Sequence, residues 1–257
     1  MHFWDYRHYL LELVKVELTQ NYKKSFLGVI WLIILPLMQS LVWIFLEKTH
    51  LLNPGILRVN YIAFVIIGTM SWQLYNYSFD QMGNSISSSV RALMQGYIPM
   101  ILIVISRFSL IFVRFVLSFI VNVIIIYFFL DIKLHVFSFL ISIIPLMIFC
   151  LSIGMIVSMI EVVSEDLFIL GKEFNKILMF LTPIIYSPKV ESSFLEYIIS
   201  MNPLTYFISV PRSFLLGEEQ TLIDNYYKYC FITAIFFILS LILYTKKARV
   251  VVEKLVE

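Results

Sequence analysis

The chain has 257 residues, of which 60% are hydrophobic and only 14% are charged, whereas about 25% of the residues in an average soluble domain are charged. A soluble fold of this size cannot hide so much apolar surface, so we expect the lipid bilayer to be its main solvent. Gly and Pro number 8 each and Cys only 2, which excludes collagen-like, disordered and disulfide-scaffold classes. A net charge of +2 and a pI near 8.4 give no indication of nucleic-acid binding.

The first 24 residues have two different faces at helical spacing. Trp4, Leu11, Val14 and Leu18 share one side of a helical wheel, and polar or charged residues occupy the other side. The pattern predicts an amphipathic cytoplasmic helix over residues 1–24 that lies along the membrane surface. Packing of this helix against other parts of the protein is an equally open interpretation.

The chain then contains six apolar stretches that we interpret as membrane-spanning helices. Arg107 and Arg114 interrupt the third stretch, so we begin that span after Arg107. The uncharged run before Lys189 is too short to cross a bilayer, so the fifth helix must begin near Leu167. The predicted spans cover about residues 25–46, 59–79, 108–130, 136–160, 167–188 and 229–245. We therefore predict an all-α integral membrane fold and a single transmembrane domain over residues 1–257.

A further apolar stretch over residues 194–216 is broken at Asn202–Pro203 and again at Pro211. Proline removes a backbone donor and kinks a helix. We therefore expect a re-entrant or interfacial helical hairpin between spans five and six, and no seventh crossing.

Lys and Arg are concentrated in four places: the N-terminal segment, the loop after span two, the start of span five and the C-terminal tail. Positively charged flanks are retained on the cytoplasmic side of a membrane. We expect both termini to be cytoplasmic, and six crossings is the even number that this orientation requires.

Several kinds of chemistry have no support in the sequence. None of the four His residues is paired with Cys or carboxylates at ligand spacing, so we expect no metal site. No Gly-rich phosphate loop occurs, so we do not expect this chain to bind ATP in that manner. We interpret Cys150 and Cys230 as small apolar side chains within spans. Catalysis by this chain alone is not expected.

Span three has a polar face, whose members fall within about 80° of one another at 3.6 residues per turn: Arg107, Arg114, Ser118 and Asn122. An arginine within the hydrocarbon costs at least about 2.5 kcal/mol, so it is expected to face a partner or a water-filled cavity. In one interpretation Arg107 reaches the cytoplasmic headgroups and Arg114 pairs with Glu161 or Glu173. In the other, the face lines a conduit and the guanidinium groups bind phosphate on an anionic substrate.

Tyrosine is abundant, with 15 in the chain. An interfacial belt near the ends of the spans is the default interpretation for most of them. A ring with a hydroxyl group also presents an apolar face and a hydrogen bond together, which suits a sliding sugar. The candidates for such a channel lining are Tyr75, Tyr77 and Tyr186.

Residues 84–96 are polar and predict a short cytoplasmic helix with a serine cap and a stop at Gly96. The apolar side of this helix would be exposed to solvent if nothing covered it, which favours docking onto a partner. The alternative is that the segment is only a linker. The docking candidates are Ser88, Ser89, Val90, Arg91, Leu93 and Met94. Ser164 is predicted to cap the fifth span, with Glu165 and Asp166 at the positive end of the helix dipole.

Several motifs occur in a recognisable order. The segment Tyr22–Trp31 (YKKSFLGVIW) leads into a first span that contains Pro36, and Thr182–Pro188 (TPIIYSP) ends span five. Asn202–Phe207 (NPLTYF) then leads through Arg212 to the sequence LLG. In this order, and over nearly the whole chain, the sequence resembles the membrane subunit of the ATP-binding-cassette (ABC) exporters that move O-antigen, capsule or teichoic acid polymers.

The resemblance implies a homodimer of this chain with two copies of a separate nucleotide-binding ATPase subunit, which would bind ATP and Mg. The helix at 84–96 would couple to that ATPase, and the hairpin at 194–216 would lie on the periplasmic side near the channel exit. Spans one and five of both copies would line the conduit. The implied cargo is a polysaccharide on a polyprenyl diphosphate carrier, with O-antigen as the first candidate, and the implied location is among the lipids of the bacterial cytoplasmic (inner) membrane.

The sequence departs from that family at two places. Met100 follows Pro99 where members often carry a basic residue, and Glu165 precedes Asp166 where they often carry Arg. Arg107 and Lys172 are candidate substitutes for these charges. Two other classes stay open: a membrane-embedded glycosyl- or phosphotransferase acting on lipid-linked sugars, and an ion-coupled carrier, for which we find no inverted repeat.

Overall fold

The computed structural model describes Lys15 and residues 30–49, 60–89, 99–188, 192–219 and 221–253. Within these residues the fold is helical and contains no strand, which confirms the all-α class. The helices are α2 (Trp31–Lys48), α3 (Tyr61–Gly83), α5 (Met100–Leu130), α6 (Val136–Ser142), α7 (Ile144–Val163), α8 (Glu165–Phe180), α9 (Ser193–Met201), α10 (Pro203–Leu216) and α11 (Ile223–Glu253). Residues 85–89 form a further short helical stretch after α3.

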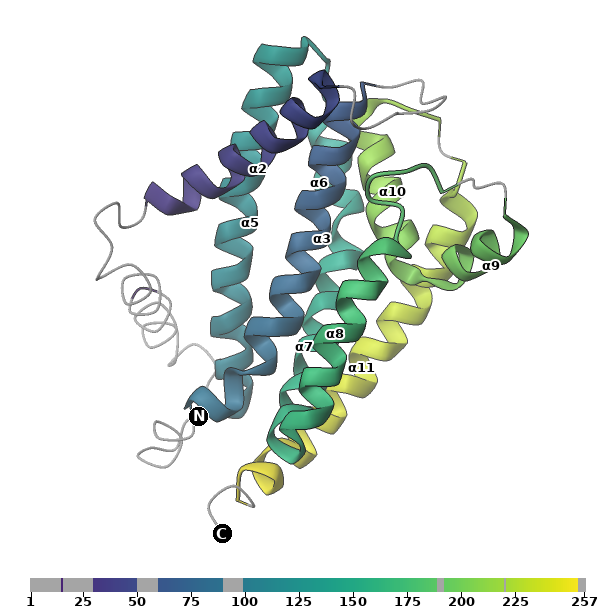
Figure 1. The fold of residues 1–257 in the computed structure, drawn as a ribbon. Coiled ribbons are helices and arrows are strands. Elements are labelled where there is room, and N and C mark those ends of the chain that lie inside the picture. Colours follow the sequence, from purple (N-terminus) through teal and green to yellow (C-terminus); the bar gives the residue numbers. More distant parts are fainter. Residues whose placement is uncertain are drawn as a thin grey trace.

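The long helices form one bundle, which α2 crosses obliquely and beside which the short α9 projects (Figure 1). Helix α3 is the centre of the bundle, because α2, α5, α7, α8 and α10 all pack against it. Nearly every residue in the first four turns of α3 is buried. Helix α7 lies between α3 and α11.

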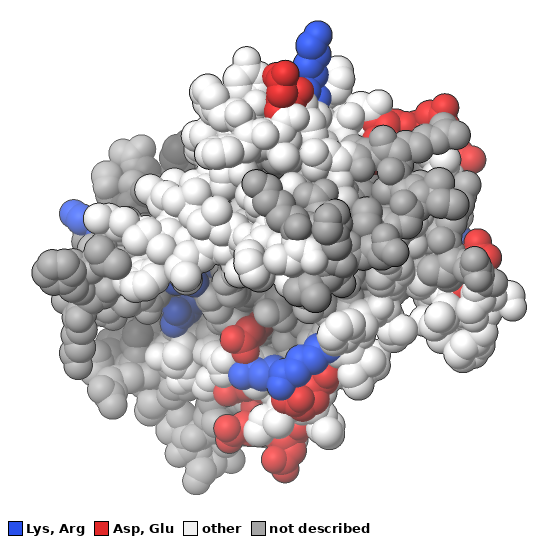
Figure 2. Space-filling view, turned by 45° about the horizontal axis from the view of Figure 1, so that its top comes forward, with Lys and Arg blue, Asp and Glu red and all other residues white. Residues whose placement is uncertain are grey.

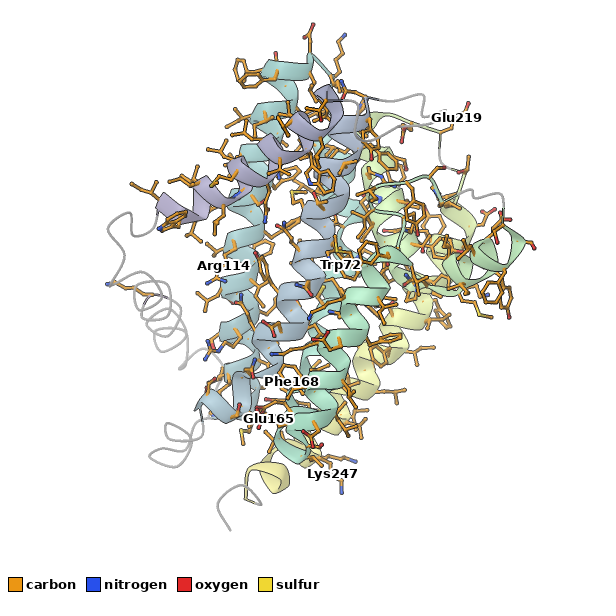
Figure 3. All side chains as sticks on the ribbon, viewed as in Figure 1. Trp72, Arg114, Glu165, Phe168, Glu219 and Lys247 are labelled. Carbon is orange, nitrogen blue, oxygen red and sulfur yellow. The ribbon has the colours of Figure 1, made fainter. Side chains whose placement is uncertain are left out.

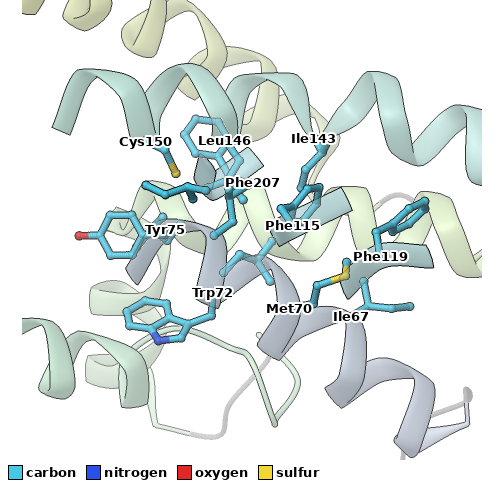
Figure 4. Close-up of a cluster of buried hydrophobic side chains, with 14 of the residues drawn as sticks. Ile67, Met70, Trp72, Tyr75, Phe115, Phe119, Ile143, Leu146, Cys150 and Phe207 are labelled. Atoms are coloured by element: carbon cyan, nitrogen blue, oxygen red, sulfur yellow. The ribbon is translucent and has the colours of Figure 1, made fainter. Parts of the chain in front are cut away.

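Aromatic and aliphatic side chains fill the space between these helices, as Figure 4 shows for the region around Tyr75, Phe119 and Phe207. The rings of Phe119 and Phe139 stack with centroids 4.9 Å apart. Helices α3 and α7 approach closely at Gly154, where an added Cβ would lie 2.5 Å from the sulfur of Met82. Close approach at small residues is a common way for membrane helices to pack.

The face of the bundle that Figure 2 shows is largely uncharged, with Lys, Arg, Asp and Glu side chains in only a few groups. Large apolar side chains are exposed along α2, α8 and α11. Among the residues that the structure describes, three helical segments are long and apolar enough to cross a membrane: Met100–Leu130, Val136–Val163 and Ile223–Ala248. The chain is therefore a multi-pass membrane protein.

The remaining predicted spans are helical but less clear-cut. Helix α2 is apolar but shorter over Trp31–Leu46, and α3 combines a long helix with several polar residues. Helix α8 has 16 residues, which corresponds to about 24 Å against a hydrocarbon core of about 30 Å. Six crossings stays a prediction.

Some helix boundaries differ from those predicted. The fifth helix ends at Phe180 rather than 188, because Pro183 lacks the amide donor that a further turn needs. The third begins at Met100, eight residues before the predicted span, since Arg107 does not interrupt helical hydrogen bonding. The fourth is divided at Ile143, next to a proline in the first turn of α7.

The hairpin is present as two helices, α9 and α10, which meet at Asn202. The Asn202 side chain accepts from the amide of Leu204, so it caps α10 where Pro203 begins that helix. The second break predicted at Pro211 is wrong, because α10 continues through Pro211 to Leu216. The lost hydrogen bond is tolerated in a helix that is buried against α6 and α11.

The longer helices α3, α5, α7, α8 and α11 run in alternating directions through the bundle (Figure 1). Helices α3, α7 and α11 end at the end of the bundle where α5 and α8 begin (Figure 1). Figure 3 shows Glu165 and Lys247 at this end and Glu219 at the other. We expect the end with Lys247 to be cytoplasmic, as the distribution of basic residues predicts. The amphipathic helix predicted at 1–24 lies outside the described residues except for Lys15, which is helical.

Candidate functional site

A groove lies between α2, α3 and α5, with a cavity volume of about 70 Å³. Its walls are mostly apolar and include Leu35 and Pro36 of α2 and Leu74 of α3. The polar residues that line it are Gln39 of α2, Gln73 and Tyr77 of α3, and Arg114 and Ser118 of α5. The groove thus combines one cation, two amides and two hydroxyls with apolar walls.

Arg114 lies midway along α5, and its label in Figure 3 marks the middle of the bundle. Its side chain is half-buried, and its Nε atom is buried without a hydrogen-bond partner. The interpretation in which Arg114 pairs with Glu161 or Glu173 is wrong. Glu173 instead pairs with Lys176 at 2.6 Å, and a buried carboxylate oxygen of Glu161 has no hydrogen-bond partner. Arg114 therefore keeps donor capacity beside the groove.

Hydrogen bonds join α2 to its neighbours next to this groove. The Gln73 amide nitrogen donates to the Gln39 side-chain oxygen at 2.6 Å. The buried Ser40 hydroxyl lies 2.7 Å from Oδ1 of Asn122, whose amide nitrogen donates to Ser118 at 3.3 Å. Ser118 and Asn122 thus share a face of α5, as the helical wheel predicts, and this face meets α2.

The structure brings together only part of the predicted channel lining. Tyr77, Arg114 and Ser118 line the groove, and Asn122 contacts Ser118 and α2. Tyr75 is instead buried, with its ring centroid 5.2 Å from that of Trp72 (Figure 4). The Tyr186 hydroxyl donates to the carbonyl of Phe180 at 2.8 Å and so satisfies the end of α8.

Arg107 lies one turn or more from the groove, toward the start of α5. Its Nη2 atom donates to the Ser88 hydroxyl at 3.0 Å. This bond joins α5 to the predicted ATPase-coupling segment, in which Ser88 and Ser89 are helical. The other predicted coupling residues, Val90, Arg91, Leu93 and Met94, lie outside the described residues.

A polar contact joins α3 to α8 at the end of the bundle where α8 begins. Lys172 pairs with Asp80 at 2.9 Å and lies over the ring of Phe168, whereas Asn175 donates to Asn76 at 3.2 Å. The predicted cap of α8 is confirmed, because the amide of Leu167 donates to the Ser164 hydroxyl at 3.3 Å. Lys172 is therefore part of a contact between two helices.

Gln39 and Gln73 were not predicted from the sequence as site residues. Each is an isolated amide within an apolar run, and this isolation was the only feature of the sequence that could have indicated a role for them. Their hydrogen bond depends on the crossing of α2 over α3, which the sequence of neither helix specifies.

The bundle thus combines long apolar helices with a groove that has apolar walls and a few polar side chains. The family model of the ABC-2 type transporter matches residues 9–216. The chain therefore belongs to the ABC-2 type transporter family and is a permease subunit of an ABC exporter. Membership implies pairing with an ABC ATPase subunit. No curated protein matches the chain.

Proposed function

We propose that the chain is the channel-forming subunit of an exporter for a polysaccharide carried on polyprenyl diphosphate, with O-antigen as the first candidate. Two copies would form a homodimer in the bacterial inner membrane, with cytoplasmic termini. Two copies of the partner ATPase would bind ATP and Mg. The motifs from Tyr22 to Gly217 support this cargo through their resemblance to polymer exporters.

The observation that carries the proposal is the guanidinium of Arg114 beside the groove between α2, α3 and α5. A guanidinium binds phosphate oxygens through paired donors. The apolar walls suit an isoprenoid chain, and the side chains of Gln39, Gln73 and Tyr77 offer hydrogen bonds and a ring to a sugar. An amphiphile with a phosphate between a lipid and a sugar matches this combination.

The test uses the chain together with its ATPase partner in lipid nanodiscs. ATP hydrolysis is measured with polyprenyl diphosphate bearing an oligosaccharide, with polyprenyl phosphate alone, and without either. We expect the glycolipid to stimulate hydrolysis, and Arg114→Gln to lower that stimulation by about tenfold, the effect of removing one charge-assisted contact. Arg114→Lys is expected to keep part of the stimulation, because it keeps the charge.

Lys247→Gln is the matched control, since this exposed residue of α11 lies away from the groove. Stimulation that is equal in Arg114→Gln and Lys247→Gln would contradict the assignment of the groove. Lengthening or transfer of the oligosaccharide in the same samples, without ATP, would favour the transferase alternative.

A further inference from the structure

The segment between α8 and the hairpin, residues 181–188, is irregular yet largely buried or half-buried. Irregular backbone at the depth of a membrane bundle needs partners from the protein for its polar groups. Side chains of α3 and the hairpin supply them here. The Tyr61 hydroxyl of α3 donates to the carbonyl of Ile185 at 3.1 Å, and the Asn202 amide nitrogen donates to the Thr182 hydroxyl at 2.8 Å.

Arg212 of α10 makes the most extensive of these contacts and is only 2% exposed. Its Nη1 atom donates to the carbonyls of Pro183 and Ile184 at 3.2 and 3.1 Å, and Nη2 lies 3.4 Å from the Ser209 hydroxyl. The guanidinium also lies over the ring of Phe64 of α3, 3.4 Å from its centroid. A positive charge just beyond the end of α8 complements the negative pole of that helix.

Gly68 of α3 indicates independently that this contact is tight. A Cβ at this position would lie 2.7 Å from the carbonyl oxygen of Ile184 and 3.0 Å from Nη1 of Arg212. Only a residue without a side chain lets the segment, the guanidinium and α3 meet at this distance.

Along the rest of its length α8 has fewer neighbours. It packs against α7 and α3, and its other face exposes Leu170, Phe174 and Ile177. The segment 181–188, which follows α8, is thus the part that connects α8 to the hairpin. The Arg212 contact joins this segment to α10.

We propose that Arg212 is a positioning residue that makes the end of α8 and the hairpin of α9 and α10 move together. A displacement of α8 that the ATPase partner drives is then transmitted to the hairpin at the opposite end of the bundle. The inference rests on an ABC ATPase that displaces α8 during its cycle, and it does not depend on the cargo.

The test compares movements of the two elements in the complex with the ATPase, in nanodiscs and without cargo. Cys150 and Cys230 are replaced by Ala, and one reporter cysteine is placed at Glu196 of α9 or at Glu173 of α8, both exposed. The rate of reaction with a water-soluble maleimide is measured without nucleotide and after trapping with ADP and vanadate. In the parent we expect trapping to change the rate at both reporters.

With Arg212→Gln we expect the effect of trapping on the reaction rate at position 196 to fall about tenfold or more. Losing charge-assisted hydrogen bonds weakens a contact by about this factor. The change at position 173 should persist. A disulfide between cysteines at Thr182 and Asn202, whose side chains are in hydrogen-bond contact, should restore the change at position 196, and reduction should abolish it again. Arg212→Lys should give an intermediate result, because it retains the charge without the planar fork.

Gly68→Ala provides a second test that leaves the arginine in place. Its new methyl group should displace the carbonyl of Ile184 and reproduce the loss at position 196. Ser71→Ala in the same helix should not, since that hydroxyl bonds only within α3.

The proposal is overturned if the change at position 196 survives in Arg212→Gln or is lost at both reporters together without recovery on oxidation. If Arg212→Gln does not assemble with the ATPase, the test rests on Gly68→Ala. An effect of trapping at position 196 that persists in Gly68→Ala would then overturn the proposal.

Discussion

Arg114 and Arg212 both lie among the helices of this protein, and their surroundings are opposite. Arg212 is completely enclosed, with two carbonyls, a hydroxyl and an aromatic ring around its guanidinium. Arg114 is half-buried beside an open groove, and its Nε atom has no hydrogen-bond partner. A cation in a membrane protein that is satisfied by its own chain acts on structure, whereas one that keeps free donor capacity next to a cavity is available to a ligand.

The largest expected effect is a difference in the stability that the protein loses when each of these two arginines is replaced. Arg212→Met leaves two buried carbonyls without their donor and should lower the free energy of unfolding by about 2–4 kcal/mol. Arg114→Met breaks no hydrogen bond or ion pair within the described part of the chain and should lower it by less than about 1 kcal/mol. Reversible unfolding in mixed detergent micelles measures both. Equal losses would mean that the two sites do not differ as described.

The second prediction concerns the attachment of α2, which forms one wall of the groove. Ser40→Ala removes the bond to Asn122 and should cost about 1 kcal/mol in the same assay. Thr245→Ala is the control, because its exposed hydroxyl contacts only carbonyls of its own helix. A cost no greater than that of the control would show that this bond does not hold α2 in place.

A smaller effect is expected at the contact between α3 and α8. Asp80→Asn breaks the ion pair with Lys172. The Asp80 side chain is 48% exposed and that of Lys172 is 38% exposed, so the loss should be less than about 1 kcal/mol. The loss should shrink further at high salt, because exposed charges are screened. Glu173→Gln, in the more exposed pair with Lys176, should have no measurable effect. A salt-independent loss in Asp80→Asn would argue against an exposed pair.

The smallest effect is a pH dependence near Arg212. Burial raises the pKa of Glu218, and the positive charge of Arg212 opposes that rise. The folded state then holds this proton more tightly than the unfolded state. The contribution of this group to stability therefore falls as pH rises from the ordinary carboxyl value through the raised one. Glu218→Gln should remove this decline from a pH series of thermal unfolding, whereas Glu219→Gln, at an exposed neighbour, should leave it.

The same two arginines show what the sequence can predict. Arg114 was recognisable because its charge interrupts an apolar run and shares a helical face with Ser118 and Asn122. Arg212 was noted only within a motif, because its partners in residues 181–188 and in α3 lie far from it in sequence. Hydrophobic length predicted the helices and the break at Asn202–Pro203, since these depend on local residues.

The parts that failed depend on contacts between helices. Whether Pro211 ends a helix is decided by the burial of α10, and whether Arg114 pairs with an acid is decided by the relative positions of α5, α7 and α8. Tyr75 and Tyr77 are two residues apart on one helix, yet one is buried and the other lines the groove. Periodicity shows that their faces differ but not which face meets a cavity.

The central claim is that the groove beside Arg114 receives the lipid-linked polymer, and photocrosslinking tests it most directly. A photoreactive residue is placed at Gln39, which lines the groove, or at Phe112, which is exposed on α5 outside it. The complex is then irradiated with radiolabelled polyprenyl-diphosphate oligosaccharide. We predict an adduct at position 39 that excess unlabelled glycolipid competes away and that Arg114→Gln greatly reduces. Equal labelling at positions 39 and 112, or labelling at 39 that is unaffected by Arg114→Gln, would contradict the claim.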